Sequence, residues 1–200
     1  MESGFGLIRG HVVVVMAPMG SGKGTLVRHA LSKYSELKQT ISCTSRAMRP
    51  GEVEGKQYYF VTAEEFDRKI AAGDFLEWAV FAGNKYGTLK SEILPRLSGA
   101  NVIIVEIELQ GVEQLLKILP REHLTIVYIE AGGWEVLRGR ALARAPMSES
   151  ELQARYERYC VEEKSKSIAD TVIDNSADIE NAYAEFDQVI EAAYNKVIRN

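Results

Sequence analysis

Near its start the chain carries the stretch Val12-Val-Val-Val-Met-Ala-Pro-Met-Gly-Ser-Gly-Lys-Gly-Thr25. The apolar run predicts a buried β-strand, and the residues after the glycines predict a helix. Gly20 and Gly22 let the backbone curl closely around an anion because they carry no Cβ. The N–H groups and the dipole of a helix N-terminus attract negative charge. The stretch therefore predicts a phosphate-binding loop in which Lys23 reaches the outer phosphates of a nucleoside triphosphate.

This loop departs from the usual pattern G-x-x-x-x-G-K-S/T at two positions. Ala17 stands in place of the first glycine, and Gly24 stands where a hydroxyl normally binds Mg²⁺. The ending Gly24-Thr25 resembles that of adenylate kinases, so we expect the metal to be held mainly through water and the phosphates. The alternative, a plain strand–turn–helix with a chance lysine, explains fewer of these features together.

The composition suits one compact domain of 200 residues, with 46% hydrophobic residues to form its core. A net charge of −4 argues against general binding to nucleic acid or to an anionic membrane. Cys43 and Cys160 are too few for a disulfide framework, and residues 1–10 hold no long apolar stretch of the signal type. We therefore expect a cytoplasmic protein without a membrane segment.

Strands and helices alternate along most of the chain, which predicts an α/β fold. Apolar strands are expected at His11–Met16, Gln39–Cys43, Val102–Ile107, Leu124–Ile129 and Thr171–Asp174. Helices are expected at Lys23–Tyr34, Val112–Leu119, Trp134–Ala143, Ser148–Ser167 and Ile179–Val197. Apolar strands joined through helices predict a parallel sheet that is covered on both faces. Ligands of such folds bind at the carboxyl ends of the strands, where the phosphate-binding loop also lies.

A mixed segment from about Thr44 to Lys90 interrupts this alternation and is predicted to be an inserted lobe. It begins with a charged, irregular loop and a strand at Tyr58–Val61. Thr62-Ala-Glu-Glu65 is a capping box that opens a helix to about Ala72. An extended run at Phe75–Phe81, a turn at Gly83-Asn84 and a helix at Leu89–Leu97 complete the segment. A second capping box, at Ser148-Glu-Ser-Glu151, lies outside the lobe.

Two arginines in the irregular loop, Arg46 and Arg49, follow the hydroxyl residues of a strand end. Guanidinium groups pair bidentately with phosphate oxygens, and Tyr58 adds a phenol donor, so the loop suits a phosphate monoester. The other interpretation is an exposed basic loop that forms salt bridges with Glu52 or Glu54. The residues of the loop alone leave both interpretations open.

The wider pattern Ser-x-x-x-Arg-x-x-Arg-x-Gly-Glu-x-x-Gly-x-x-Tyr, from Ser42 to Tyr58, resembles guanylate kinases. The likeness covers nearly the whole chain, in order, and continues in Phe75-Leu-Glu-Trp78, Gly83-Asn-Lys-Tyr-Gly-Thr88, Glu106-Ile-Glu-Leu-Gln-Gly111 and Asn175. It implies a three-layer P-loop nucleoside monophosphate kinase fold in a single domain, 1–200. The core is then expected at 1–43 and 91–200, a small mixed α+β GMP-binding insertion at about 44–90, and a helical lid at about 140–158.

The resemblance assigns two groups of residues to GMP. Its phosphate is expected to bind Arg46, Arg49, Tyr58 and Tyr86, and its guanine is expected to bind Ser42, Glu77, Thr88 and Glu108. Guanine offers N1–H and N2–H₂ donors that suit carboxylates, and an O6 acceptor that suits a hydroxyl. Such a buried polar edge rejects adenine because the groups of the site would stay unpaired. The alternatives are a solvated strand residue for Glu77 and simple packing for Tyr86.

On the ATP side the resemblance implies binding by the loop and closure by a lid. The expected ATP-binding residues are Ala17, Pro18, Met19, Gly20, Ser21, Gly22, Lys23, Gly24, Thr25 and Asn175. The expected catalytic residues are Lys23, Arg46 and three lid arginines, Arg140, Arg144 and Arg155. For the lid arginines the alternative is surface pairing with Glu135, Glu149 or Glu151, and for Asn175 it is a turn or helix cap. Arg138 and Arg158 are interpreted as surface residues.

Glu106-Ile-Glu108 replaces the Asp-x-Asp of the family and keeps both charges on longer side chains. Glu106 is the candidate to hold Mg²⁺, through its waters, and Glu108 is the candidate for the guanine contact. The methionines suggest no cofactor, and the histidines lack metal-binding spacing. Cys43, Trp78 and Trp134 are interpreted as packing residues.

We therefore expect a phosphotransferase that moves the γ-phosphate of ATP to GMP or dGMP, giving ADP and GDP, with Mg²⁺. Two alternatives stay open: a kinase for another acceptor such as IMP or AMP, and a non-enzymatic binding module of the same fold. The intact Lys23 and lid arginines favour an enzyme. The expected partners are the nucleotides ATP and GMP, without nucleic acid or membrane, and the choice between monomer and homodimer stays open.

Overall fold

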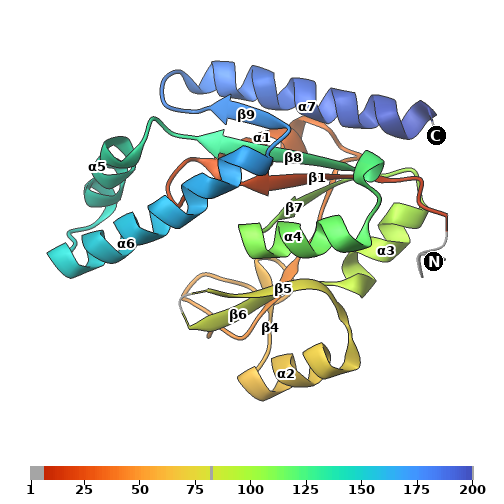
Figure 1. Cartoon of the computed structure of the whole chain (residues 1–200), viewed down its shortest axis with the longest axis horizontal. Coiled ribbons are helices and arrows are strands. Elements are labelled where there is room, and N and C mark those ends of the chain that lie inside the picture. The colour runs from red at the N-terminus through yellow and green to blue at the C-terminus, as the bar shows by residue number, and fades with distance from the viewer. Residues whose placement is uncertain (1–6, 82, 200) are drawn as a thin grey trace.

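The computed structural model describes residues 7–81 and 83–199. Its main sheet holds five parallel strands in the order β2-β7-β1-β8-β9. The strands are β1 (His11–Met16), β2 (Lys38–Gln39), β7 (Val102–Glu106), β8 (Leu124–Glu130) and β9 (Thr171–Asp174). The expected α/β fold with a parallel core sheet is confirmed, and Figure 1 shows this sheet between layers of helices.

Alternate residues of β1 are buried on opposite faces of the sheet. Val13 and Val15 pack toward α1 (Lys23–Lys33) and α7 (Ile179–Arg199). Val12 and Val14 pack on the other face, together with apolar residues of α3 (Lys90–Ser98) and α4 (Leu109–Ile118). The strand is buried along its whole length, which matches the unbroken apolar run in the sequence. A short 3₁₀ turn, η1 (Arg121–His123), leads into β8.

The inserted segment forms a second sheet of its own, which we call the small lobe. Its strand order is β4-β3-β6-β5 and its pairing is mixed, parallel for β3–β4 and antiparallel for the others. The strands are β3 (Ser42–Thr44), β4 (Tyr58–Phe60), β5 (Phe75–Phe81) and β6 (Asn84–Leu89). Helix α2 (Ala63–Ala72) covers this sheet through Phe66, whose ring stacks on Phe75 at 4.3 Å between centroids.

One local prediction within this region is wrong, and one strand was not predicted. The expected single strand Gln39–Cys43 is divided, because Gln39 pairs with Ile104 of the core whereas Ser42 pairs with Tyr58 of the small lobe. The expected turn is present at Gly83, but the strand β6 that follows it was not predicted, because it contains Gly87 and glycine weakens a strand pattern. A Cβ at that position would lie 2.7 Å from the carbonyl oxygen of Glu77, so the close strand pairing requires a glycine there.

The segment predicted to be a lid, at about 140–158, lies within α5 (Trp134–Arg144) and α6 (Glu149–Glu162), which are followed by the 3₁₀ segment η2 (Glu163–Ile168). The α-helix expected to reach Ser167 thus ends earlier, with its last part wound as 3₁₀. Both predicted capping boxes are present: Thr62 caps α2 and Ser148 caps α6. Trp134 packs against Tyr156 and Tyr159, as expected for a packing residue. Within the described ranges, every helix is too short or too polar to cross a bilayer.

Candidate active site

The phosphate-binding loop lines a cavity of about 360 Å³ at the carboxyl end of β1, which we call the loop cavity. Gly20 and Gly22 have φ angles of 91° and 94°, in the left-handed region that glycine adopts without strain. Gly22 is also the N-cap of α1, so the helix N-terminus faces the cavity. The predicted residues that line it are Ala17, Pro18, Met19, Gly20, Ser21, Gly22, Lys23, Gly24 and Thr25.

Asn175 lies behind this loop, where its buried side chain supports the backbone. Its Nδ2 donates to the carbonyl oxygen of Ser21 at 2.7 Å. A Cβ on Gly22 would approach that Nδ2 to 2.2 Å, so the fit between the two residues leaves no room for a side chain. The Arg140 guanidinium donates to the carbonyl oxygen of Asn175 at 2.9 Å and to that of Gly20 at 3.5 Å. Asn175 and Arg140 therefore hold the loop in shape.

A second cavity of about 380 Å³, the lobe cavity, lies between the small lobe and the core sheet. It adjoins the loop cavity, because Met19, Lys23, Phe81 and Glu108 line both. Seven of the residues predicted to bind GMP line it: Ser42, Arg46, Arg49, Tyr58, Glu77, Tyr86 and Glu108. The structure thus brings together residues from β3, β4, β5 and β6, from the loop between β3 and β4, and from the segment after β7, which lie far apart in the sequence.

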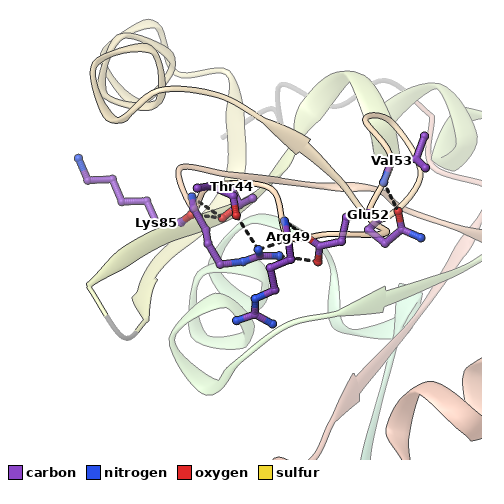
Figure 2. A network of polar contacts seen from close by, with 8 residues as sticks. Thr44, Arg49, Glu52, Val53 and Lys85 are labelled. Atoms are coloured by element: carbon purple, nitrogen blue, oxygen red, sulfur yellow. Dashed lines mark hydrogen bonds and ion pairs between the residues drawn. The ribbon is translucent and has the colours of Figure 1, made fainter.

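Arg46 is held at the lobe cavity by Glu52. The guanidinium forms a bidentate pair with that carboxylate, at 2.7 Å and 3.0 Å, and its carbon lies 5.5 Å from the ring centroid of Tyr58. This pairing raises the pKa of Arg46 and lowers the pKa of Glu52. Figure 2 shows Glu52 also accepting from the backbone N–H of Arg49, at 2.8 Å. The predicted salt bridge to Glu52 is confirmed, and Arg46 lines the cavity, where its binding of a phosphate monoester stays a prediction.

Glu77 is the buried carboxylate of the lobe cavity. It is 3% exposed, and the Thr88 hydroxyl donates to its Oε1 at 2.6 Å. Burial raises the pKa of Glu77 to about 7, although the hydrogen bonds from Thr88 act in the opposite direction. Gly111 leaves room for this group, since a Cβ there would lie 2.5 Å from Oε2. The alternative of a solvated strand residue is wrong, and Thr88 lies behind Glu77 as its hydrogen-bond donor.

Glu106 lines the lobe cavity and lies beside Lys23, which lines both cavities. Its Oε2 lies 3.8 Å from Nζ of Lys23, and its Oε1 accepts from Gln39 at 2.8 Å. Among the residues that the structure describes, no three His, Cys, Asp or Glu side chains gather to hold a metal ion by themselves. Mg²⁺ commonly uses one or two carboxylates and completes its shell with water and substrate phosphates. Glu106 beside the loop lysine, with Thr25 lining the same loop cavity, fits that arrangement.

The lid arginines differ in their surroundings. Arg155 contacts the sulfur of Met19 at 2.8 Å, whereas the side chain of Arg144 lies outside the described part of the chain. Arg138 is exposed beside Glu135, as expected. The interpretation of Arg158 as a surface residue is wrong, because its guanidinium lines the loop cavity and pairs with Glu162 at 3.0 Å. Helical spacing alone did not show that this face of α6 turns inward.

The sequence analysis did not predict three further residues of the loop cavity, Phe81, Arg28 and Glu162. Arg28, on α1, donates to the Thr25 hydroxyl at 3.2 Å and lies 3.3 Å from where a Cβ of Gly24 would stand. Its place one turn after the loop is a signal that helical spacing could have supplied. Glu162 lies on the inward face of α6 and carried no comparable signal. Cys43 is fully buried, and burial raises the pKa of its thiol to about 11, so its interpretation as a packing residue is confirmed.

The fold and the two adjoining cavities define a class of protein, the α/β proteins with a phosphate-binding loop and an inserted lobe. A family model described as guanylate kinase matches residues 9–193. The chain therefore belongs to the guanylate kinase family.

Individual relatives agree with this assignment. A guanylate kinase from Trichormus variabilis is 39% identical over 184 residues, which cover 92% of this chain and 89% of that protein. One from a Synechococcus strain is 48% identical over 118 residues, 59% of this chain, and this match spans 64% of the relative's length. The crystal structure of guanylate kinase from Anaplasma phagocytophilum aligns with a TM-score of 0.73 at 27% identity, covering 94% of this chain and 87% of that one.

Proposed function

We propose that this protein transfers the γ-phosphate of ATP to GMP, giving ADP and GDP, with the loop cavity as the donor site and the lobe cavity as the acceptor site. The observation that carries the proposal is the buried Glu77–Thr88 pair in a cavity that shares Lys23 with the phosphate-binding loop. A buried carboxylate accepts the N–H donors of guanine and would be left unpaired by adenine. Family membership supports the same reaction.

The residues of the two cavities promote an in-line transfer without a protein nucleophile. An oxygen of the GMP phosphate attacks the γ-phosphorus, and the bond to the ADP oxygen breaks. Arg46 orients the acceptor phosphate, while Lys23 and the loop N–H groups stabilise charge on the donor phosphates. Arg140 contributes by holding the loop, and Arg155 and Arg144 are placed on the lid helices from which we propose that they reach the phosphates.

Mg²⁺, when bound, would neutralise charge between the β- and γ-phosphates. Glu106 is the side chain we propose to hold it, through water, because Gly24 removes the usual hydroxyl ligand. Glu106 also accepts a hydrogen bond from Gln39 and lies 3.8 Å from Nζ of Lys23, so these contacts fix its place at the lobe cavity.

We also propose that the chain acts as one domain with three parts: a core at 1–43 and 91–200, the GMP-binding lobe at 44–90 and the lid at 140–158. Closure of lobe and lid over both nucleotides would exclude water, which otherwise competes as an acceptor. The free thiols of Cys43 and Cys160 suit a reducing compartment such as the cytoplasm.

The test is a coupled ADP-release assay with ATP and Mg²⁺ and with GMP, dGMP, IMP or AMP as acceptor. We expect turnover with GMP or dGMP, weaker turnover with IMP, which lacks the 2-amino group, and the least with AMP. Turnover greatest with AMP would instead support the alternative acceptor. No turnover with any acceptor, in a folded protein that still binds GMP, would support the non-enzymatic module.

A further inference from the structure

Arg158 of the lid touches the small lobe directly. Its guanidinium carbon lies 3.1 Å from the ring centroid of Phe81, at the end of β5. The two residues belong to elements far apart in the sequence, and both line the loop cavity. A planar guanidinium over an aromatic face combines stacking with cation–π attraction. This contact joins the lid to the small lobe across the mouth of the site.

Glu162 connects the same arginine to the phosphate-binding loop. Its Oε1 accepts from Nε of Arg158 at 3.0 Å, and its Oε2 accepts from the backbone N–H of Met19 at 3.3 Å. Burial, and next the nearby Glu108 carboxylate, raise the pKa of Glu162, so its ionised form depends on these partners. Arg158 is thereby fixed in direction, with its face toward Phe81.

On the lobe side the contacts continue to the acceptor site. The ring of Phe81 meets that of Tyr86 edge-on, at 5.8 Å between centroids and 81° between planes. Tyr86 in turn meets Tyr58 at 5.7 Å, and both tyrosines line the lobe cavity. Packed side chains therefore run without a gap from the acceptor cavity, through Phe81 and Arg158, to the loop that holds the donor.

We propose that Arg158 is a positioning residue that couples the two nucleotide sites, by transmitting the position of the small lobe to the lid. This inference rests on the proposed function only in that the two cavities bind GMP and ATP. When GMP draws the lobe inward, Phe81 moves Arg158 and α6 with it. The free energy needed to close the lid is then smaller when ATP binds. Coupling between two sites is reciprocal, so ATP promotes GMP binding by the same factor.

The experiment measures the Kd of a non-hydrolysable ATP analogue with and without saturating GMP, by calorimetry on the full chain. The ratio of the two values is the coupling factor, expected at about 5-fold or more in the wild type. Arg158→Lys keeps the charge but removes the planar group, and Phe81→Leu removes the ring. Each change is expected to reduce the factor to below about 2-fold, and the double variant to lose no more than either one. Phe81→Tyr keeps an aromatic ring and should keep the wild-type coupling factor.

The matched control is Arg138→Lys, which changes an exposed arginine of the other lid helix beside Glu135 and leaves the factor unchanged. Because Arg158 acts through position, Arg158→Lys raises the KM for each nucleotide at low levels of the other by a larger factor than it lowers kcat at saturation. Coupling that persists in Arg158→Lys, or is absent from a wild type that binds both nucleotides, overturns the proposal. A wild type that binds neither nucleotide refutes the proposed function itself, which is a different result.

Discussion

The two cavities are built from different parts of the polypeptide. The loop cavity is formed largely by the backbone of residues 17–25, with glycines at the positions of positive φ and a lysine at the helix start. The lobe cavity is formed by side chains from several strands. They include the buried carboxylate of Glu77 and the bidentate ion pair of Arg46 with Glu52. A phosphate chain is the same in every nucleoside triphosphate, whereas a guanine must be distinguished from an adenine.

This difference indicates how recognition is divided between the cavities. Backbone N–H groups bind any phosphate, so we propose that the loop cavity stabilises charge with little choice of base. A buried carboxylate has a strict requirement for donors, so we propose that the lobe cavity selects the acceptor base. Variants of the loop should therefore change the rate or the fold, and variants of the lobe should change which acceptor is used.

The largest effect is expected for Lys23→Ala, which removes the loop cation at the point where the two cavities meet. Loss of one group that stabilises transition-state charge costs about 10²–10³-fold in kcat. Steady-state kinetics with GMP measures it, with Arg138→Ala as the exposed control. A loss below about 3-fold would mean that Lys23 does not stabilise the transferred group.

Glu77→Gln should come next and should act on selection. The amide keeps the shape and its oxygen can still accept from Thr88, but an NH₂ group, which donates, replaces the other oxygen that would accept from the N–H groups of guanine. Loss of charge-assisted hydrogen bonds of this kind lowers kcat/KM for GMP by about 10–100-fold. The value for AMP should change little, so the GMP-to-AMP ratio falls. An unchanged ratio would remove Glu77 from base recognition.

Gly22→Ala tests the backbone character of the loop cavity. A side chain at φ 94° is strained, and its Cβ would meet Asn175 at 2.2 Å. We expect a loss of about 1–3 kcal/mol in unfolding free energy, seen as a lower Tm, together with weaker ATP binding. Gly139→Ala is the matched control, because its Cβ meets no atom within 4 Å. Equal Tm values for the two variants would contradict the close fit.

The pH dependence of GMP binding tests the role of Glu77 in the lobe cavity. Because burial raises the pKa of Glu77 to about 7, GMP must displace a proton below that pH, and its affinity should fall by up to about 10-fold per pH unit. In Glu77→Gln, the GMP affinity should not show this fall below pH 7. The titration of the GMP phosphate itself should affect the wild type and the variant alike. A wild-type profile parallel to that of the variant would show that Glu77 is already ionised.

The same group should affect stability in the opposite direction to most carboxylates. A pKa above the ordinary value of 4.5 means that the ionised group costs stability, beginning as pH rises past about 4.5 and complete above about 7. The Tm of Glu77→Gln minus the Tm of the wild type should therefore be more positive at pH 8 than at pH 5.

The smallest effect is expected from the two helix caps. Ser148→Ala and Thr62→Ala each remove a capping box and should cost about 1 kcal/mol of unfolding free energy. Ser148→Ala should also raise the KM for ATP a few-fold, because α6 carries Arg155 and Arg158. Thr62→Ala should not, since α2 packs on the small lobe. Thermal melts and ATP saturation curves measure both; equal KM changes would contradict this assignment.

Much of the fold could be predicted because local signals agreed with one another. The apolar run of β1, the glycines of the loop and the two capping boxes each fix an element by chemistry that lies within a few residues. Glu77 was placed in the site by its likeness to a family pattern, and its burial against Thr88 then follows from the pairing of β5 with β6.

The missed features depend on contacts between distant segments. The division between β2 and β3 arises because neighbouring residues pair with strands of two different sheets, and no local sequence pattern shows this. Arg155 and Arg158 are the same residue type on the same helix, and only the contact with Phe81, at the end of β5, distinguishes Arg158. Asn175 was expected near the adenine, but the structure places its side chain behind the loop, against Ser21. Its role toward ATP stays a prediction.

The central claim is that the loop cavity binds the donor phosphates while Glu77 of the lobe cavity selects the acceptor base. Separate calorimetric titrations of GMP and of a non-hydrolysable ATP analogue onto the wild type and Glu77→Gln test it most directly. The account predicts that the variant weakens GMP binding by about 10-fold or more and changes analogue binding by less than about 2-fold. Equal loss for both ligands, or no loss for GMP, would contradict it.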